Sequence, residues 1–208
     1  DEVITFVPCF PEYSVFAAQA GAQLIKVKTC DGTFDIDVAA FRSALTPKTK
    51  AVIINSPNNP SGVVYPESSI RALCDVLREH SAKLGSPVYL ISDEPYRELV
   101  YGGEELPYVM NYYKNSIVCY SFSKSLSVPG ERIGYIAVSS EAEDRGNVYA
   151  AVCGAGRSLG YVCAPSLMQQ VCAKLIGKTS DISAYERNRD VLCSALTSYG
   201  FGVVKPQG

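Results

Sequence analysis

The chain has 208 residues, of which 47% are hydrophobic and 19% are charged, and its formal net charge is −2. This composition predicts a folded globular protein with a sizeable core and excludes a disordered chain. The charge provides no basic surface for nucleic acid, and no apolar run approaches the roughly 18 residues that a membrane span requires. We therefore expect neither a nucleic-acid partner nor a membrane.

Strand-like and helix-like segments alternate along the chain. Apolar runs predict strands at residues 3–8, 22–28, 51–56, 87–92, 116–121 and 132–138, and helical spacing predicts helices at 11–21, 35–45, 66–84, 161–177 and 180–199. The pattern at 66–84 is the clearest, with Pro66 in its first turn and Gly85 after its end. Strands joined by helices predict an α/β fold, with three αβα layers around a mainly parallel, mixed sheet.

The eight cysteines leave two interpretations open. They could form disulfides, but they lie in or next to apolar stretches and none belongs to a CxxC pair. We favour reduced, buried thiols, which are typical of cytoplasmic proteins. His80 is the one histidine and lies in a polar stretch of a helix, and the His/Cys spacing of a zinc site is absent, so we expect no metal.

Polar or aromatic side chains follow four of the predicted strands. Residues 3–8 run into CFPEY, 51–56 into PNNPSG, 87–92 into DEPY and 116–121 into FSK. Ligands of open α/β sheets bind outside the carboxyl ends of the strands. We therefore expect one cleft to collect Phe10, Asn59, Asp93, Tyr96, Ser121 and Lys124.

Lys124 and Asp93 are the two residues with the most specific chemistry. A lysine after a strand is usually solvated, but Lys124 stands among serines after an apolar strand, where desolvation would favour the free, nucleophilic amine. Asp93 could be a turn residue. A carboxylate at this place can also hold a ring nitrogen protonated, since an opposite charge within about 4–6 Å favours the charged form by about 1–3 pKa units. Pyridoxal phosphate requires such a partner.

The remaining candidates each have a simpler structural alternative. Tyr96 could donate its phenol to a ring oxygen, or it could be a packed aromatic residue. Asn59 could belong only to the turn that NNPSG predicts, and Phe10 could belong only to the core. Arg132 could grip a phosphate with two parallel hydrogen bonds, or it could form a structural salt bridge.

Three motifs together resemble a known family. They are NNPSG at 58–62, SDEPY at 92–96 and SFSK followed by GERIGY within 121–135. Their order and spacing are similar to those of fold-type I pyridoxal-phosphate enzymes, and within these to the class I/II, aspartate-aminotransferase-like aminotransferases. The resemblance covers nearly the whole chain and implies an α/β large domain, pyridoxal 5′-phosphate as cofactor, and amino acids and 2-oxo acids as substrates.

The resemblance also implies a role for each site residue. Lys124 would form the Schiff base and move the proton, and Asp93 would pair with the pyridine nitrogen. Tyr96 and Asn59 would bind the ring oxygen, and Phe10 would stack on the ring. The phosphate would be held by Ser121, Ser123 and Arg132.

Relatives of this family begin upstream of this sequence and continue beyond it, and they are commonly homodimers. We therefore interpret residues 1–179 as a large domain without its N-terminal part, 180–200 as a long helix leading to a small domain, and 201–208 as the start of that domain. Arg157 and Tyr161 lie where the family often reaches toward a partner subunit. The phosphate loop and the carboxylate-binding arginine are missing, so we expect this fragment alone to be inactive.

Three alternative functions remain. The same cofactor and fold also serve β-lyases, decarboxylases and synthases, and an aminotransferase-like domain can be a regulatory module fused to a DNA-binding domain. SFSK also fits the S-x-x-K motif of serine acyltransferases and β-lactamase-like hydrolases, with Ser121 as nucleophile. That motif requires SDN and KTG downstream, and neither tripeptide occurs.

Overall fold

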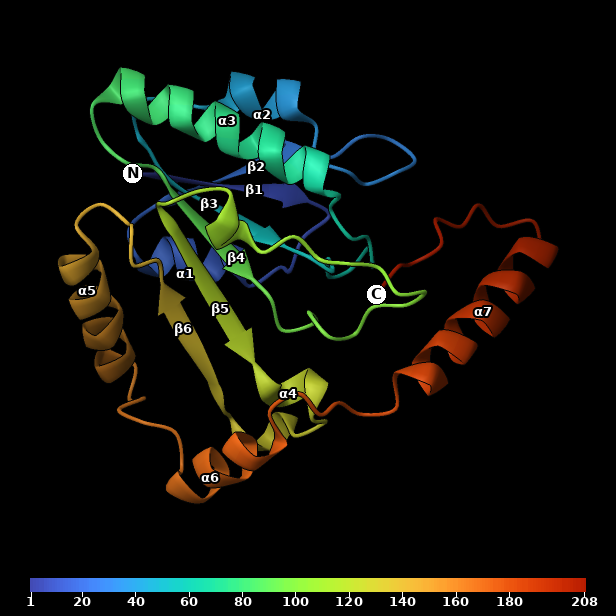
Figure 1. Ribbon diagram of the computed structural model, residues 1–208. Helices are drawn as coiled ribbons and strands as arrows, with labels where there is room; N and C mark the ends of the chain where they lie inside the picture. Colours follow the sequence, from blue (N-terminus) through green and yellow to red (C-terminus); the bar gives the residue numbers. More distant parts are fainter.

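The computed structural model describes residues 1–208 and is built on one central sheet (Figure 1). The strands are β1 (Glu2–Val7), β2 (Gln23–Lys28), β3 (Thr49–Asn55), β4 (Tyr89–Asp93), β5 (Ser116–Ser121) and β6 (Gly134–Val138). The helices are α1 (Tyr13–Gln19), α2 (Val38–Ala44), α3 (Glu67–Leu84), α4 (Phe122–Ser125), α5 (Arg145–Ser158), α6 (Ser166–Leu175) and α7 (Ile182–Ser198), with short 3-10 turns at Val109–Asn111 and Pro129–Glu131.

The six strands lie in the order β2-β1-β3-β4-β5-β6. β1 to β5 pair in parallel, and β6 runs antiparallel to β5. The predicted mixed, mainly parallel sheet is therefore confirmed. The register aligns Asn55 with Asp93 and Asp93 with Cys119, so the carboxyl ends of three neighbouring strands meet in one row.

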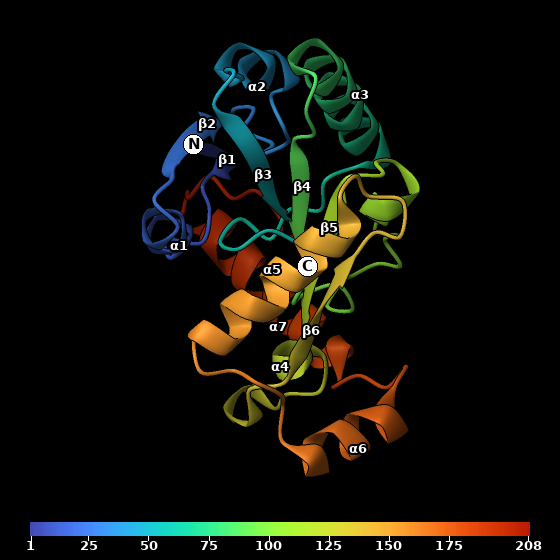
Figure 2. The same ribbon diagram turned by 90° about the vertical axis from the view of Figure 1, so that its left-hand side faces the viewer.

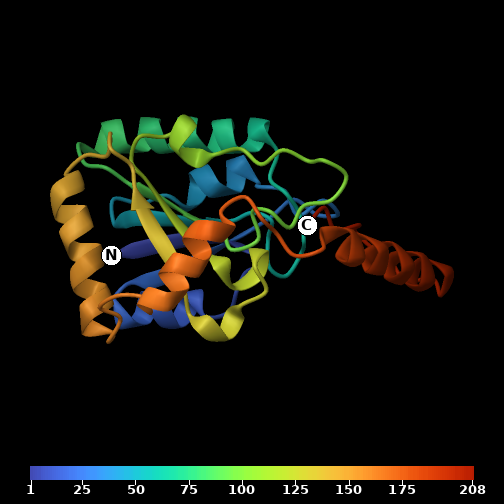
Figure 3. The same ribbon diagram turned by 60° about the horizontal axis from the view of Figure 1, so that its bottom comes forward.

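Helices cover both faces of the sheet and complete the three predicted layers. α2 and α3 lie on one face and α1 lies on the other (Figures 1 and 3). The main core forms beneath α3, whose Ile70, Leu73 and Leu77 are buried with Val52 and Leu90 of the sheet. Pro66 directly precedes α3, and Gly85 ends it with a left-handed φ of 71°, a conformation that glycine adopts without steric cost.

The C-terminal part of the chain packs much less tightly. α5 runs alongside β6 (Figures 1 and 2), and α7 projects from the body of the molecule (Figures 1 and 3). Neither α5 nor α7 contains a buried residue, and Cys172 is the buried residue of α6. The helix expected at 161–177 begins at Ser166 instead, because Pro165 restricts the backbone before it.

The cysteines correct one expectation. All eight are free thiols, but only Cys74 and Cys172 are buried, while Cys153 and Cys163 are exposed. The exposure follows from their positions, on α5 and in the segment after it, where the chain packs loosely. His80 is also less solvated than expected, since its ring Nε2 lies 3.1 Å from the Thr46 carbonyl oxygen. No helix combines the length and the apolar character that crossing a membrane would require.

Candidate functional site

Asp93 stands at the carboxyl end of β4, next to the ends of β3 and β5. Its Oδ2 accepts a 2.6 Å hydrogen bond from the hydroxyl of Tyr13, the first residue of α1. Burial raises the pKa of the Asp93 carboxyl, and the hydrogen bond from Tyr13 partly offsets that rise. A half-buried carboxylate with one phenol partner can therefore gain much from a cation placed beside it.

Tyr13 is fixed by its own packing. Phe10 lies edge-on to the Tyr13 ring with the centroids 5.6 Å apart, an arrangement that aromatic pairs prefer. Burial, followed by the Asp93 charge, raises the pKa of Tyr13 far above its usual value, so the phenol keeps its proton and remains a donor. Phe10 thus contacts the residue that holds Asp93.

Asn59, Tyr96 and Lys124 form a second group. Asn59 Nδ2 donates to the Tyr96 hydroxyl over 3.2 Å, and the Lys124 ammonium lies 5.7 Å from the centre of the Tyr96 ring. Three segments that are far apart in the sequence therefore place an amide, a phenol and an amine together. Lys124 is nevertheless exposed, so the desolvated surroundings that we expected for this amine are not provided by the packing around α4.

Asn55 joins the two groups through both ends of its side chain. Its Nδ2 donates to the Asp93 carbonyl over 2.8 Å, and its Oδ1 accepts from the Asn59 amide over 2.6 Å. The side chain is buried, and both of its polar ends are satisfied in this way. Asn55 therefore fixes the distance between the β4 end and the loop that carries Asn59.

Sequence reasoning did not identify Tyr13 or Asn55. Both partners of Asp93 are distant from it in sequence. Asn55 becomes its neighbour through the β3–β4 register, and Tyr13 through the position of α1 against the sheet. One signal was available for Asn55, which is a polar residue ending an apolar strand of a buried sheet. A buried amide at such a place needs hydrogen-bond partners and therefore indicates a structural or functional role.

Ser121 caps the short helix that carries Lys124. Its Oγ accepts from the Ser123 amide over 3.2 Å and donates to the Ser123 hydroxyl over 2.8 Å. Arg132 follows the Pro129–Glu131 turn with a left-handed φ of 53°, and its Nη1 donates to the Pro129 carbonyl over 2.7 Å. The guanidinium is exposed, and the hydrogen bond that it makes lies within this turn.

A cleft of about 800 Å³ opens beside these strand ends. Its polar lining includes Asp93, Ser121 and Arg132, and Tyr161 also lines it. Cys119 lies in the same wall, and burial, followed by the Asp93 charge, raises the pKa of its thiol to about 12. The cleft therefore presents a carboxylate, a hydroxyl and a guanidinium to one ligand, while the cysteine in the wall stays protonated at neutral pH.

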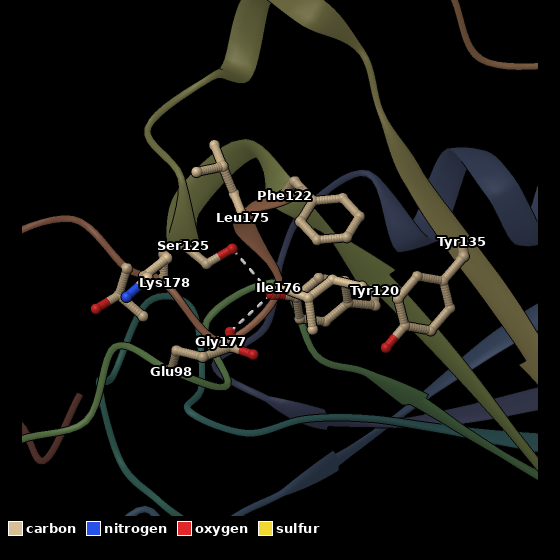
Figure 4. A pocket seen from close by; sticks show the side chains of 10 residues that line it. Glu98, Tyr120, Phe122, Ser125, Tyr135, Leu175, Ile176, Gly177 and Lys178 are labelled. Atoms are coloured by element: carbon tan, nitrogen blue, oxygen red, sulfur yellow. Dashed lines mark hydrogen bonds between the residues drawn. The ribbon is translucent and has the colours of Figure 1, made fainter. Parts of the chain in front are cut away.

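A second, smaller pocket of about 250 Å³ contains none of the predicted site residues. In Figure 4 the Tyr120 hydroxyl points between Glu98 and Ser125, from which it lies 2.9 and 2.8 Å away. The Tyr120 ring stacks on Tyr135 with the centroids 5.0 Å apart. These contacts satisfy the Tyr120 hydroxyl and connect the end of β5 with α4 and β6.

The comparisons with known proteins identify the family. The family described as "Aminotransferase class I and II" matches residues 1–208, the whole length of the sequence. The chain is a member of the class I and II aminotransferase family. Members of this family use pyridoxal phosphate.

Individual relatives agree with this assignment. An aspartate/prephenate aminotransferase of Thermus thermophilus is 31% identical over 220 aligned residues, which include 100% of this chain and 53% of the relative. A crystal structure of an aminotransferase from Eubacterium rectale superimposes with a TM-score of 0.98 at 54% identity, and a Thermus thermophilus aspartate aminotransferase with maleate superimposes with a TM-score of 0.80 at 30% identity. In both structures the match takes in 100% of this chain and about half of the other, 52% and 53%. The chain thus spans about half the length of these relatives.

Some of the side chains described above fit the family cofactor. The half-buried carboxyl of Asp93 suits a protonated ring nitrogen, and the phenol of Tyr96 with the amide of Asn59 suits a ring oxygen. Ser121 and Arg132 offer a hydroxyl and a cation on one cleft wall, which suits a phosphate group. Asp93, Ser121 and Arg132 line the cleft, whereas Phe10, Asn59, Tyr96 and Lys124 of the expected set do not.

Proposed function

We propose that the protein containing this chain is a pyridoxal-phosphate-dependent aminotransferase, which transfers an amino group between an L-amino acid and a 2-oxo acid. The observation that carries the proposal is the pair of hydrogen bonds made by the Asn55 side chain. It connects Asn59, whose side chain contacts Tyr96, to the strand end that carries the half-buried Asp93 carboxyl, and the Lys124 amine lies 5.7 Å from the centre of the Tyr96 ring. An amine and a carboxylate fixed at neighbouring strand ends are what this chemistry needs from the protein.

Each residue would then have a defined task. Bound pyridoxal phosphate supplies an electron sink for the charge that develops when an amino acid loses its Cα proton. Asp93 would keep the ring nitrogen protonated, with Tyr13 as its fixed donor. Tyr96 and Asn59 would orient the ring through its oxygen, and Lys124 would move the proton between the substrate Cα and the cofactor C4′.

The remaining residues would bind and orient. Ser121, Ser123 and Arg132 would hold the phosphate, provided that the Arg132 guanidinium leaves the Pro129 carbonyl that it now contacts. Phe10 would cover the ring face from the side where it already packs on Tyr13. These tasks bind and position the ring, while proton transfer is left to Lys124.

The organisation of the complete protein is part of the proposal. Residues 1–179 would form most of the large domain, 180–200 the helix toward a small domain, and 201–208 the start of that domain, consistent with a chain that covers 53% of its Thermus relative. A homodimer is supported by the exposed Tyr161 beside the cleft, where a partner subunit could contact it. Eight unpaired cysteines support a reducing compartment, the cytoplasm.

The test separates amino transfer from other reactions of the same cofactor. The complete protein is supplied with single amino acids, with and without 2-oxoglutarate, and the oxo-acid product is measured. We expect sustained product only with 2-oxoglutarate, and a loss of at least about 100-fold in Lys124→Ala, because a positioned acid–base group contributes that much. Lys178→Ala, which changes another exposed lysine, is the matched control. Product formation that ignores 2-oxoglutarate would indicate a lyase or decarboxylase and contradict the proposal.

A further inference from the structure

The last three residues of the chain, 206–208, form a short segment that we call the strap. It lies against the loop at residues 57–64, which carries Asn59. The Gln207 amide donates to the Gly62 carbonyl over 2.7 Å, and the Gly208 amide donates to the same oxygen over 3.1 Å. Two amides thus converge on one carbonyl of the loop.

The Gln207 side chain adds a third contact to this loop. Its Oε1 accepts from the Val64 amide over 3.1 Å, so Gln207 is hydrogen-bonded to both Gly62 and Val64. On its other side, the Gln207 carbonyl accepts from the Tyr101 amide over 2.8 Å. The strap therefore pairs with the 57–64 loop along one edge and with the segment at Tyr101 along the other.

The fit around the strap leaves no room for additional atoms. A Cβ on Gly62 would lie 2.6 Å from Pro206 Cβ, and a Cβ on Gly208 would lie 2.6 Å from the Leu99 carbonyl oxygen and 2.7 Å from Pro57 Cγ. The strap consequently touches both ends of the loop, at Pro57 and at Gly62. Contact at two ends restrains the residues between them.

Pro206, the first residue of the strap, is hydrogen-bonded to α7. Arg189 of α7 donates from Nη1 to the Pro206 carbonyl over 3.2 Å, and its guanidinium lies 4.5 Å from the centre of the Tyr101 ring. The Arg189 side chain is only 12% exposed, although α7 contains no buried residue. Arg189 therefore connects an otherwise loosely packed helix to the strap.

Inside the loop, the restraint leads directly to Asn59. The Gly62 amide donates to the Asn58 carbonyl over 2.7 Å, the Asn58 amide donates to Val63 over 2.9 Å, and the Asn59 amide donates to Asn55. We infer that the strap is a positioning element for the cofactor site, in which Gln207 acts through Gly62 to hold Asn59 against Tyr96. This inference rests on the proposed function, because Asn59 is given its task there.

Two variants on the strap side test the inference in the complete protein. Gln207→Ala removes the acceptor of the Val64 amide, and Gly208→Ala pushes the strap away from Leu99 and Pro57. Lys205→Ala is the matched control, because the neighbouring Lys205 pairs with Asp190 and makes no hydrogen bond to the loop. The first measurement is hydrogen exchange at residues 57–64 without cofactor. We expect exchange to be about fivefold to tenfold faster in both strap variants, which corresponds to the free energy of one lost hydrogen bond. We expect no change in the control.

The second measurement is the pH midpoint of the visible absorbance band after pyridoxal phosphate is added. Asn59→Ala defines the shift produced by losing Asn59, and both strap variants are expected to shift the midpoint in the same direction. Exchange at 57–64 that matches the Lys205→Ala control would overturn the inference. Faster exchange with an unshifted midpoint would also overturn it, because the strap would then not position Asn59. If wild-type protein bound no cofactor at all, the proposed function would fail. The exchange measurement, which needs no cofactor, would still show whether the strap restrains residues 57–64.

Discussion

At Asp93, the stability of the fold favours a neutral carboxyl group, whereas the proposed chemistry requires a charged one. Desolvation penalises the carboxylate, while Tyr13 and a bound cation favour it. A site that binds a protonated ring nitrogen needs a charged partner, and without the ligand that charge is costly to the fold. Two variants separate these effects.

The first is Asp93→Asn, studied without cofactor. The pKa of Asp93 is raised in the folded protein, mainly by burial, so the folded state binds the proton more readily than the unfolded state and ionisation destabilises the fold. At pH 7 we expect the complete protein with Asp93→Asn to unfold at a higher urea concentration than wild type. The difference should shrink as the pH falls toward the ordinary aspartate value of 3.8. A variant that is less stable than wild type at pH 7 would contradict this account of Asp93.

The second is Tyr13→Phe, which removes the hydroxyl that donates to Asp93. Without this donor the pKa of Asp93 rises further, because one of the interactions that lowers it is lost. We expect the dissociation constant for pyridoxal phosphate to rise about 10-fold to 150-fold, which corresponds to the free energy of one hydrogen bond to a charged group. Spectroscopic titration with cofactor measures it. Tyr199→Phe changes a tyrosine that is 77% exposed and should leave the constant unchanged; equal constants in both variants would refute the role of Tyr13.

Among the elements, the antiparallel β5–β6 pair places the lysine motif. Ser121 pairs with Gly134 at the point where β5 ends and α4 begins. A Cβ on Gly134 would overlap the Tyr120 carbonyl oxygen and lie 3.1 Å from Ser121 Cα. Glycine is therefore the residue that allows the two backbones to approach this closely.

Gly134→Ala should consequently weaken the pair that supports Lys124. We expect the free energy of unfolding to fall by about 1–3 kcal/mol, the usual cost of inserting a methyl group into a filled space. Gly130→Ala, four residues earlier, has open space around it and should be nearly neutral. Urea unfolding of both variants checks this, and indistinguishable midpoints would show that the close approach at Gly134 is unimportant.

The elements also show what the sequence could predict. The six strands and five of the seven helices were predicted because apolar residues recur with the right period, whereas the four-residue α4 and the longer α5 were missed. The longer helix, α5, contains Gly154 and Gly156, and glycine has a low intrinsic helix propensity. At the site, the residue types after each strand were predictable. The Asn55–Asp93 and Tyr13–Asp93 contacts were not, because the first depends on the strand register and the second on where α1 lies against the sheet.

For the whole molecule, the uneven burial is the main feature. α3 and the sheet hold the core, while Leu159, Val162 and Val191 of the C-terminal part are each exposed by about two thirds or more of their surface. Large apolar side chains that gather on a surface usually mark an interaction site. Relatives of about twice this length have additional chain that could cover them.

The isolated 1–208 chain is therefore expected to bind a hydrophobic fluorescent dye more strongly than the complete protein does. Exposed apolar side chains on α5, α6 and α7 provide the binding surface, and coverage would remove it. Dye fluorescence per mole at equal concentration measures the difference. Equal fluorescence would show that these side chains stay exposed in the complete protein.

The central claim is that Lys124 holds the cofactor. The most direct measurement is to incubate the complete protein with pyridoxal phosphate, reduce it with borohydride, digest it and locate the added mass by peptide mapping. We predict the added mass on the peptide that contains Lys124, with none in Lys124→Ala and the same adduct at Lys124 in Lys178→Ala. An unchanged covalent adduct in Lys124→Ala, or one located on another lysine, would contradict the account.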